Sequence, residues 1–314
     1  MSDGCGTYAH WPLHVWAPDA DLVRALNELT DVEATLVTSD GELPPDAGNV
    51  EVLVPGFSIE RVRECIAVNP KLRVIQTMSA GVDYLEGEVP ETVRLCDARG
   101  VHDVTVAEWV LAGILAERRE LPRFALQQAA GTWEGGGAAG ELFGSRVLIV
   151  GHGSIGEAVE KRLVPFEVTV TRVARTAREG VHATSELPLL LPEADVVVVL
   201  VPLTSSTRGL VDKDFLAAMP DGALLVNAAR GPVADTDALV SELQSGRLRA
   251  VLDVTDPEPL PAGHPLWSAP GLLLTPHIGG NTTGFPARMI SFISDQVERF
   301  RDGNALGNVV SGDY

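Results

Sequence analysis

Three polar residues stand directly after apolar runs, at points where buried strands are expected to end. They are Arg230 in "VNAARGPV", Glu258 in "DVTDPEPL" and His277 in "LLTPHIGG". Residues just beyond strand C-termini line the ligand crevice of a doubly wound sheet. There a guanidinium can pair with a carboxylate and polarise a ketone, and an imidazole can donate a proton. A carboxylate beside the imidazole orients it and favours its protonated form, so the trio suits hydride addition to a 2-oxo acid.

Each of these residues taken alone also has a structural interpretation. A single histidine is more often structural than catalytic, and Glu258, which stands between two prolines, could be a turn residue. The combination of the three residue types at three strand ends favours the catalytic interpretation.

A glycine-rich turn precedes the trio in the stretch "VLIVGHGSIGEAVEKRL", residues 147–163. Gly151 allows a tight turn after a strand, Gly153 lets the backbone approach a pyrophosphate, and Gly156 lets helix and strand pack closely. Ser154 and Ile155 begin a helix whose free N–H groups and partial positive charge favour that pyrophosphate. The alternative is a purely structural glycine turn, but the flanking strand and helix favour a dinucleotide cradle.

The second strand of this unit decides which dinucleotide is expected. A carboxylate after that strand would bind both ribose hydroxyls of NAD and repel a 2′-phosphate. Residues 171–175 contain no carboxylate, and Arg172 follows Gly151 by 21 residues, with Arg175 close by. A guanidinium can form a fork with phosphate oxygens and can stack on adenine. The sequence therefore favours NADPH over NADH, with NAD still possible; the alternative is that these arginines form a solvated turn.

Strands and helices are expected to alternate along the whole chain, with near-continuous Val/Leu strands that are typical of a parallel sheet covered on both faces. The expected class is α/β, with two doubly wound parallel-sheet domains. Residues 1–98, completed by 283–314, form the smaller domain, and 99–282 form the dinucleotide-binding domain. A long helix around residues 106–119 is expected to join the two domains, and Pro122 is expected to start a second helix. The expected strands are 13–17, 33–37, 50–56, 72–77, 167–171, 195–201, 222–228, 249–254 and 271–277.

Composition and charge disfavour several classes of binding partner. The 314 residues carry a net charge of −19, which disfavours nucleic acid or an anionic membrane as partner, although residues 160–180 are locally basic. The cysteines Cys5, Cys65 and Cys96 show no paired spacing, which argues for a reducing compartment. No secretory signal is visible at the N-terminus, and the longest apolar run, 187–203, is interrupted by prolines and acids. We therefore expect a cytoplasmic protein that acts on a small molecule, and no metal site.

Several motifs together resemble the D-isomer-specific 2-hydroxyacid dehydrogenase family over nearly the whole chain. "QTMSAGVDYL" (76–85) resembles its substrate loop and "VAEWVLAGILAERR" (106–119) its interdomain helix. "GHGSIG", "VPLTSSTRGLV" (201–211), "NAARGPVADTDAL" (227–239), "DVTDPEP" (253–259) and "PHIGG" (276–280) follow in the family's order. The resemblance implies a Rossmann-type cofactor domain, a flavodoxin-like substrate domain and a cleft between them.

The resemblance also implies roles for individual residues. Arg230, Glu258 and His277 match the catalytic trio, of which Arg230 and His277 also bind substrate. Ala80 and Gly81 match the loop whose N–H groups hold the substrate carboxylate, although Gly81 could be a simple turn glycine. Asp253 matches the residue that holds the nicotinamide carboxamide, with a strand-end cap as the alternative. The further cofactor-contacting positions are Thr105, Pro202, Thr207 and Ala229.

Arg172 and Arg175 make the chain look like the branch of NADPH-dependent glyoxylate and hydroxypyruvate reductases. The resemblance implies a D-2-hydroxy acid product and a homodimer through the interdomain helices. Met78, Phe57 and Phe285 are expected to help shape the substrate pocket. Two alternatives stay open: a dehydrogenase of another small anion such as formate or phosphite, and a non-catalytic dinucleotide-sensing protein on the same fold.

Overall fold

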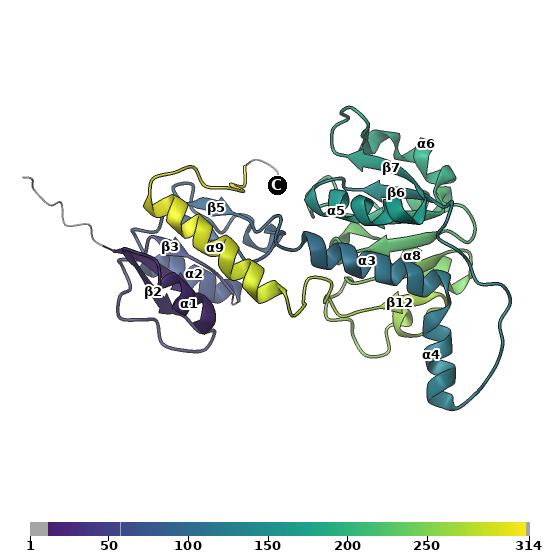
Figure 1. Cartoon of the computed structure of the whole chain (residues 1–314), viewed down its shortest axis with the longest axis horizontal. Helices are drawn as coiled ribbons and strands as arrows, with labels where there is room; N and C mark the ends of the chain where they lie inside the picture. The colour runs from purple at the N-terminus through teal and green to yellow at the C-terminus, as the bar shows by residue number, and fades with distance from the viewer. Residues whose placement is uncertain (1–11, 57, 312–314) are drawn as a thin grey trace, which may run out of the picture. The chain divides into compact units, whose positions relative to one another are not determined.

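A computed structural model describes residues 12–56 and 58–311, and the chain divides into two compact units (Figure 1). Unit 1 is the chain up to Val101 together with the segment from Pro286 onward, and unit 2 is His102–Phe285. Each unit is an α/β fold built on one parallel sheet, as the sequence predicts. The first cysteine, Cys5, and the aromatic residue Phe57 lie outside the described residues.

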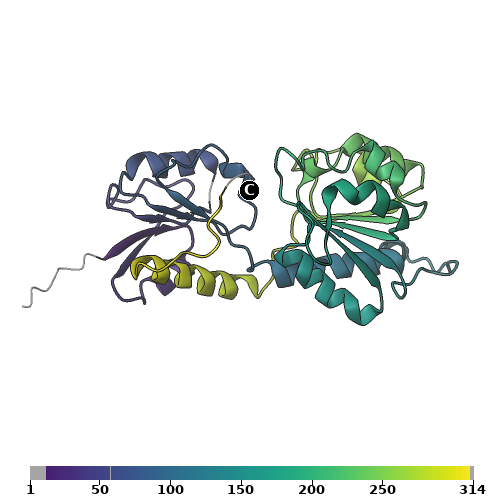
Figure 2. The same ribbon diagram turned by 90° about the horizontal axis from the view of Figure 1, so that it is seen from above.

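Unit 1 contains a five-stranded parallel sheet in the order β2-β1-β3-β4-β5. Helix α2 (Ile59–Val68) covers one face, and α1 (Ala20–Leu26) and α9 (Phe285–Arg301) cover the other (Figure 2). Buried Trp16, Leu53 and Ile75 from the sheet pack with Val62 and Cys65 of α2. The strands are β1 (Leu13–Ala17), β2 (Val32–Leu36), β3 (Val52–Leu53), β4 (Val74–Gln76) and β5 (Arg94–Cys96).

The last helix belongs to unit 1 although it follows the whole of unit 2 in sequence. Its apolar stripe is buried at Met289, Ile293 and Val297. Buried Gln296 Nε2 donates to Gln76 Oε1 at 2.8 Å and to the Gly307 carbonyl at 2.9 Å. Because a buried amide without partners is costly, this pairing fixes the position of α9 on β4.

Unit 2 contains a seven-stranded parallel sheet in the order β12-β11-β10-β9-β6-β7-β8. The chain proceeds to one side from β6 through β7 to β8, then returns past β6 to build β9 to β12 on the other side. This reversal of strand order is the switch point at which ligands bind in such sheets. The strands are β6 (Arg146–Val150), β7 (Thr169–Ala174), β8 (His182–Ala183), β9 (Val196–Val199), β10 (Leu224–Asn227), β11 (Arg249–Leu252) and β12 (Leu272–Leu274).

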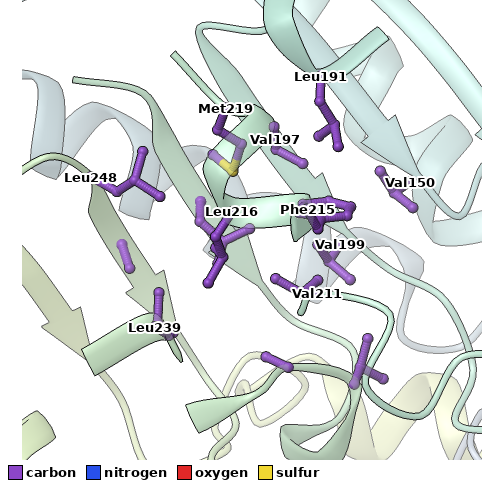
Figure 3. Packing of buried hydrophobic residues seen from close by; sticks show 14 of the residues in the cluster. Val150, Leu191, Val197, Val199, Val211, Phe215, Leu216, Met219, Leu239 and Leu248 are labelled. Atoms are coloured by element: carbon purple, nitrogen blue, oxygen red, sulfur yellow. The ribbon is translucent and has the colours of Figure 1, made fainter. Parts of the chain in front are cut away.

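Helices cover both faces of this sheet, which is why its strands read as continuous apolar runs. Helices α3 (Asp103–Arg118) and α5 (Ser154–Leu163) lie on one face (Figure 2). On the other face, α6 (Leu187–Leu190), α7 (Lys213–Ala218) and α8 (Thr236–Gln244) contribute to the cluster of buried side chains in Figure 3. The short 3₁₀ helices of the chain are Asp83–Leu85, Val164–Phe166, Thr184–Glu186, Leu191–Glu193, Gly231–Val233 and Pro265–Ser268.

Three expectations about the elements need correction. The helix that was expected to join the two domains rather than to belong to either core is α3. It buries Val106, Ala107, Val110 and Ile114 in the core of unit 2, because its inner face lies against α5 and the sheet. The strand expected at 167–171 instead spans Thr169–Ala174. The short strands β5 and β8 were not expected, since three and two residues carry too little periodicity.

Two further observations concern compartment and membrane. Cys65 and Cys96 are free and buried, and burial raises the pKa of each thiol to about 11, so both stay protonated near neutral pH. Among the described residues, no helix has the length and apolar character needed to cross a bilayer.

Candidate functional site

The strands of unit 2 are all parallel, so their carboxyl ends meet at one edge of the sheet. The glycine turn follows β6 near the middle of that edge. Arg230 follows β10, Glu258 follows β11 and His277 follows β12, and these three strands are neighbours. Arg172 lies inside β7 and Arg175 directly follows this strand, on the opposite side of the turn. A dinucleotide lying along the edge would therefore meet the arginines at one end and the polar trio at the other.

His277 and Glu258 form the central contact of the trio. The imidazole Nδ1 lies 2.6 Å from Glu258 Oε1, and both side chains remain partly exposed, at 46% and 41%. Because Glu258 occupies Nδ1, the ring's Nε2 is the nitrogen that can exchange a proton with a ligand. The structure thus brings together these two residues as the sequence predicts.

The backbone at His277 has φ of 53°, a left-handed conformation that costs a non-glycine residue about 1–2 kcal/mol. Hydrogen bonds offset this cost: the His277 amide donates to the carbonyls of Asp253 at 2.8 Å and Thr275 at 3.1 Å. The unusual conformation aims the imidazole toward Glu258 rather than along the strand, and such strained residues cluster at functional sites.

Arg230 lies on a loop that packs tightly on the loop carrying Glu258. A Cβ added to Gly231 would lie 1.9 Å from the Thr255 carbonyl oxygen, so only glycine permits this approach. Arg230 Nη1 donates to the carbonyl of buried Ala229 at 2.9 Å, and the Ala229 amide donates to Asn227 Oδ1 at 3.0 Å. The loop that carries Arg230 therefore has a fixed backbone.

Asp253 is buried at the end of β11 and already has three donors. Its Oδ1 accepts from the Thr275 hydroxyl at 2.6 Å and from the Ile278 amide at 2.9 Å. Its Oδ2 accepts from the Gly279 amide at 2.7 Å. An ionised carboxylate has about four acceptor sites, so a carboxamide could still bind, and the predicted contact with nicotinamide stays a prediction.

The glycine turn fits a pyrophosphate. A Cβ on Gly151 (φ 106°) would lie 2.6 Å from the Leu200 carbonyl carbon, and one on Gly156 would lie 2.6 Å from the Gly151 oxygen. A Cβ on Gly153, in contrast, would meet nothing within 4 Å, so the turn leaves open space there. Gly153 also begins α5 without a side-chain cap, which leaves the amides of the first turn available to an anion.

Arg172 does not follow its strand, as the sequence analysis expected, but lies inside β7, where it faces α5. Its Nε donates to Glu160 Oε2 at 2.8 Å, and Nη2 contacts the other carboxylate oxygen. His152, within the glycine turn, approaches the same Oε2 at 2.7 Å through Nε2. The hydrogen bond from Arg172 holds the pKa of Glu160 below its usual range, so Glu160 stays ionised and neutralises part of the positive charge near the turn.

Arg175 is the first residue after β7 and is exposed. Arg178, three residues further on, reaches back to the cradle, where its Nη2 donates to the His152 carbonyl at 2.8 Å. The basic segment noted in the sequence therefore borders the glycine turn.

The remaining predicted cofactor contacts occupy organised turns. The Thr207 hydroxyl donates to the Pro202 carbonyl at 2.5 Å and accepts from the Thr204 amide at 2.8 Å, which closes the loop after β9. The hydroxyl of buried Thr105 donates to the His102 carbonyl at 2.9 Å at the start of α3. Ser154 and Ile155 open α5 at the glycine turn. Contact of these residues with a cofactor stays a prediction.

The predicted substrate loop belongs to unit 1 and follows β4. The Thr77 hydroxyl donates to the Ser79 carbonyl at 2.7 Å, and the Ser79 hydroxyl donates to the Gly81 carbonyl at 2.8 Å. These bonds fix the backbone that carries Ala80 and Gly81. Of the residues expected to shape the pocket, Phe285 stacks on His102 with ring centroids 4.9 Å apart.

Comparison with known proteins agrees with this geometry. Residues 111–279, more than half of the chain, match the family model described as "D-isomer specific 2-hydroxyacid dehydrogenase, NAD binding domain". The chain belongs to this family. The predicted family resemblance is therefore confirmed, and so is the fold of two parallel-sheet α/β units.

Individual relatives span different functions within the family. The D-3-phosphoglycerate dehydrogenase of Methanocaldococcus jannaschii is 29% identical over 310 residues, which cover 96% of this chain but only 58% of that protein. The glyoxylate reductase/hydroxypyruvate reductase of Homo sapiens is 36% identical over 69% of this chain and 70% of its own length. A solved family structure from Xanthobacter autotrophicus Py2, in complex with NADPH and MES, aligns with a TM-score of 0.81 at 29% identity, over 96% of this chain and 98% of that one.

Sequence reasoning did not single out four residues that the structure ties to the site: His152, Glu160, Trp109 and Thr275. Glu160 falls on the α5 face that meets β7, and helical spacing from the glycine turn could have indicated this. The pairing of Trp109 Nε1 with the Thr275 hydroxyl at 3.0 Å joins residues 166 positions apart, so no local signal could reveal it.

The open space at Gly153 leads to a direct test of the cradle. Gly153→Ala should leave the melting temperature unchanged, since its methyl group would meet no protein atom within 4 Å, yet weaken dinucleotide binding by about tenfold or more. Nicotinamide fluorescence titration measures the affinity. Gly135→Ala, also with nothing within 4 Å, is the matched control and should bind normally. Unchanged affinity in Gly153→Ala would exclude the turn as the pyrophosphate site.

Proposed function

We propose that this chain is an NAD(P)-dependent dehydrogenase that transfers a hydride between NADP(H) and a small 2-oxo or D-2-hydroxy acid of the glyoxylate or hydroxypyruvate type. The observation that carries the proposal is the His277–Glu258 pair, 2.6 Å apart at the edge that also holds the glycine turn. Arg230 on the neighbouring strand end supplies a cation for an anionic substrate. Family membership and the named reductase relative support the same reaction class.

Each residue of the site has its own role in the proposed reduction. When bound, the reduced nicotinamide supplies the hydride. Arg230 binds the substrate carboxylate and polarises the adjacent carbonyl, while His277 Nε2 donates a proton to the carbonyl oxygen as negative charge develops there. Glu258, which contacts Nδ1, keeps the imidazole in the orientation that leaves Nε2 outward. Ala80 and Gly81 would offer backbone N–H groups to the carboxylate.

The proposed role of His277 can be tested with a matched histidine. The chain contains a second exposed His–Glu pair, His182–Glu186, at 2.8 Å and with similar exposure, located on the edge strand β8. With glyoxylate and NADPH, His277→Ala should reduce kcat by ~10²–10⁴-fold, since proton transfer typically contributes that much. His182→Ala should retain activity, and both variants should bind NADPH normally. Absorbance of the reduced nicotinamide measures turnover.

The wild-type assay also separates the alternatives. Consumption of NADPH with glyoxylate or hydroxypyruvate supports the proposal. Activity only with formate or phosphite and an oxidised cofactor would assign the chain to another small anion. Cofactor binding with no turnover on any of these compounds, and a His277→Ala variant that behaves like wild type, would favour a dinucleotide-sensing protein.

We also propose that NADPH is preferred over NADH, through Arg172 and Arg175. Both arginines lie at the β7 end of the edge, where the adenosine half of a dinucleotide is expected, and no carboxylate occupies residues 171–175. Arg172 is held against Glu160 inside β7, whereas Arg175 is exposed directly after the strand, so Arg175 is expected to contribute more. The NADPH complex of a family relative supports the same preference.

Arg175→Ala should weaken NADPH binding by about tenfold or more, and Arg172→Ala by a smaller factor, because hydrogen bonds to charged groups contribute ~1.5–3 kcal/mol. NADH affinity should hardly change in either variant. Arg146→Ala removes an equal charge from the opposite end of β6, where Arg146 pairs with Asp195 at 3.0 Å, and serves as the control. Equal weakening of both cofactors in the β7 variants would contradict the assignment.

A homodimer is part of the proposal, as is a reducing, cytoplasmic location that the two free buried cysteines support. Helix α4 (Leu121–Ala130) buries none of its residues in this chain and extends from the end of α3 (Figure 1). Its Leu121, Phe124 and Leu126 are 54%, 38% and 73% exposed. Apolar side chains left exposed along a helix are typical of an interaction surface.

The dimer can be tested by light scattering coupled to size exclusion. Wild type should elute at twice the monomer mass, and Leu126→Glu should shift it toward the monomer, because a charge would enter the contact. Leu189→Glu, at a similarly exposed leucine (79%) of α6, is the control and should remain dimeric. A monomeric wild type, or a Leu126→Glu variant that stays dimeric, would exclude α4 as the contact.

A further inference from the structure

A partly buried hydrogen-bonded network connects helix α3 to the segment that carries His277. Trp109 Nε1 donates to the Thr275 hydroxyl at 3.0 Å, and that hydroxyl donates to Asp253 Oδ1 at 2.6 Å. The Asp253 carboxylate in turn accepts the amides of Ile278 and Gly279. Thr275 precedes His277 in the chain, and Ile278 and Gly279 follow it. The network therefore holds the chain on both sides of His277.

The directions of these bonds follow from the chemistry of the groups. An indole N–H can only donate, and an ionised carboxylate can only accept. The Thr275 hydroxyl can do both, so it alone can link Trp109 to Asp253. Valine has the same shape as threonine but can do neither, whereas serine keeps the hydroxyl.

Packing leaves this arrangement little freedom. A Cβ added to Gly279 would lie 2.8 Å from Asp253 Oδ2 and 3.4 Å from Trp109 Cγ. The carboxylate and the indole therefore pack directly against the backbone of the turn. Asp253 is 5% exposed and the turn's left-handed residue is His277 itself, with φ of 53°. Without the bonds from Asp253, the chain at His277 would relax toward ordinary dihedral angles and turn the imidazole away from Glu258.

We propose that Trp109 and Thr275 are positioning residues for His277: through Asp253 they hold its left-handed turn and so set the place from which the imidazole delivers its proton. The inference rests on the proposed function, in which His277 is the proton donor. Within the described part of the chain, neither side chain hydrogen-bonds to the imidazole, so we infer that both act through the backbone of the turn. Asp253 then has a structural duty in addition to any contact with a cofactor.

The experiment compares Thr275→Val with Thr275→Ser in the full chain. Thr275→Val should lower kcat with glyoxylate and NADPH by about 10- to 100-fold, since a displacement of about 1 Å in a reacting group can cost that much. NADPH affinity, from fluorescence titration, should change less than threefold. Thr275→Ser should restore kcat to near the wild-type value, and Trp109→Phe should give an intermediate loss because the indole donor is removed but Thr275 still binds Asp253.

Amide hydrogen exchange of residues 276–280 in the cofactor-free protein provides a readout that does not depend on turnover. Exchange of the Ile278 and Gly279 amides should be faster in Thr275→Val and Trp109→Phe than in wild type, and unchanged in Thr275→Ser. If the wild type is inactive on every substrate, the proposed function fails, and this exchange pattern still decides whether the network holds the turn.

Three results would overturn the inference. Wild-type kcat and exchange in Thr275→Val would show that the turn does not need the hydroxyl. Equal losses in Thr275→Val, which keeps the methyl group, and Thr275→Ser, which keeps the hydroxyl, would show that any change at this position is harmful and that the hydroxyl is not what positions His277. Parallel losses of kcat, NADPH affinity and melting temperature in Thr275→Val would indicate general destabilisation of unit 2 and not positioning of His277.

Discussion

Parallel pairing of seven buried strands is the constraint on which the rest of unit 2 depends. Because every strand runs in the same direction, the turns that leave β6, β7, β9, β10, β11 and β12 all emerge at one edge. Parallel strands need crossover connections, and the helices that provide them cover both faces of the sheet and keep it dry. Polar chemistry is thereby confined to the ends of strands, where the glycine turn, the arginines and the polar trio are found.

Close backbone approach is the second requirement of this edge. Gly151, Gly156 and Gly231 each stand where a Cβ would overlap another part of the main chain. The first two join the turn to the neighbouring strand and to α5, and the third joins the loop of Arg230 to that of Glu258. Gly153 differs from them, since its missing side chain leaves space for a ligand and not for protein.

Charge at the edge is arranged locally against an acidic molecule. The chain has a net charge of −19, yet Arg178 donates to the His152 carbonyl of the glycine turn, and Arg172 is linked to His152 through Glu160. Glu160 accepts a hydrogen bond from Arg172 and also contacts the turn residue His152. Its negative charge therefore offsets part of the positive charge near the turn. At the other end of the edge, Glu258 contacts and orients the imidazole of His277. Acidic partners thus orient the basic groups at both ends of the site.

The sequence by itself determined the fold class, the family, the glycine turn and the polar residues at strand ends, because these depend on local periodicity and on residues that follow strands directly. It also predicted the pairing of His277 with Glu258, because both follow strands that end at the same edge and a carboxylate beside an imidazole orients it. Tertiary structure alone decided that Arg172 lies within β7 facing Glu160, that α3 is part of the core, and that Trp109 binds Thr275. The strand β7 ends three residues beyond its expected end, which places Arg172 inside the strand, and contacts between residues far apart in sequence arise only when helices pack on the completed sheet.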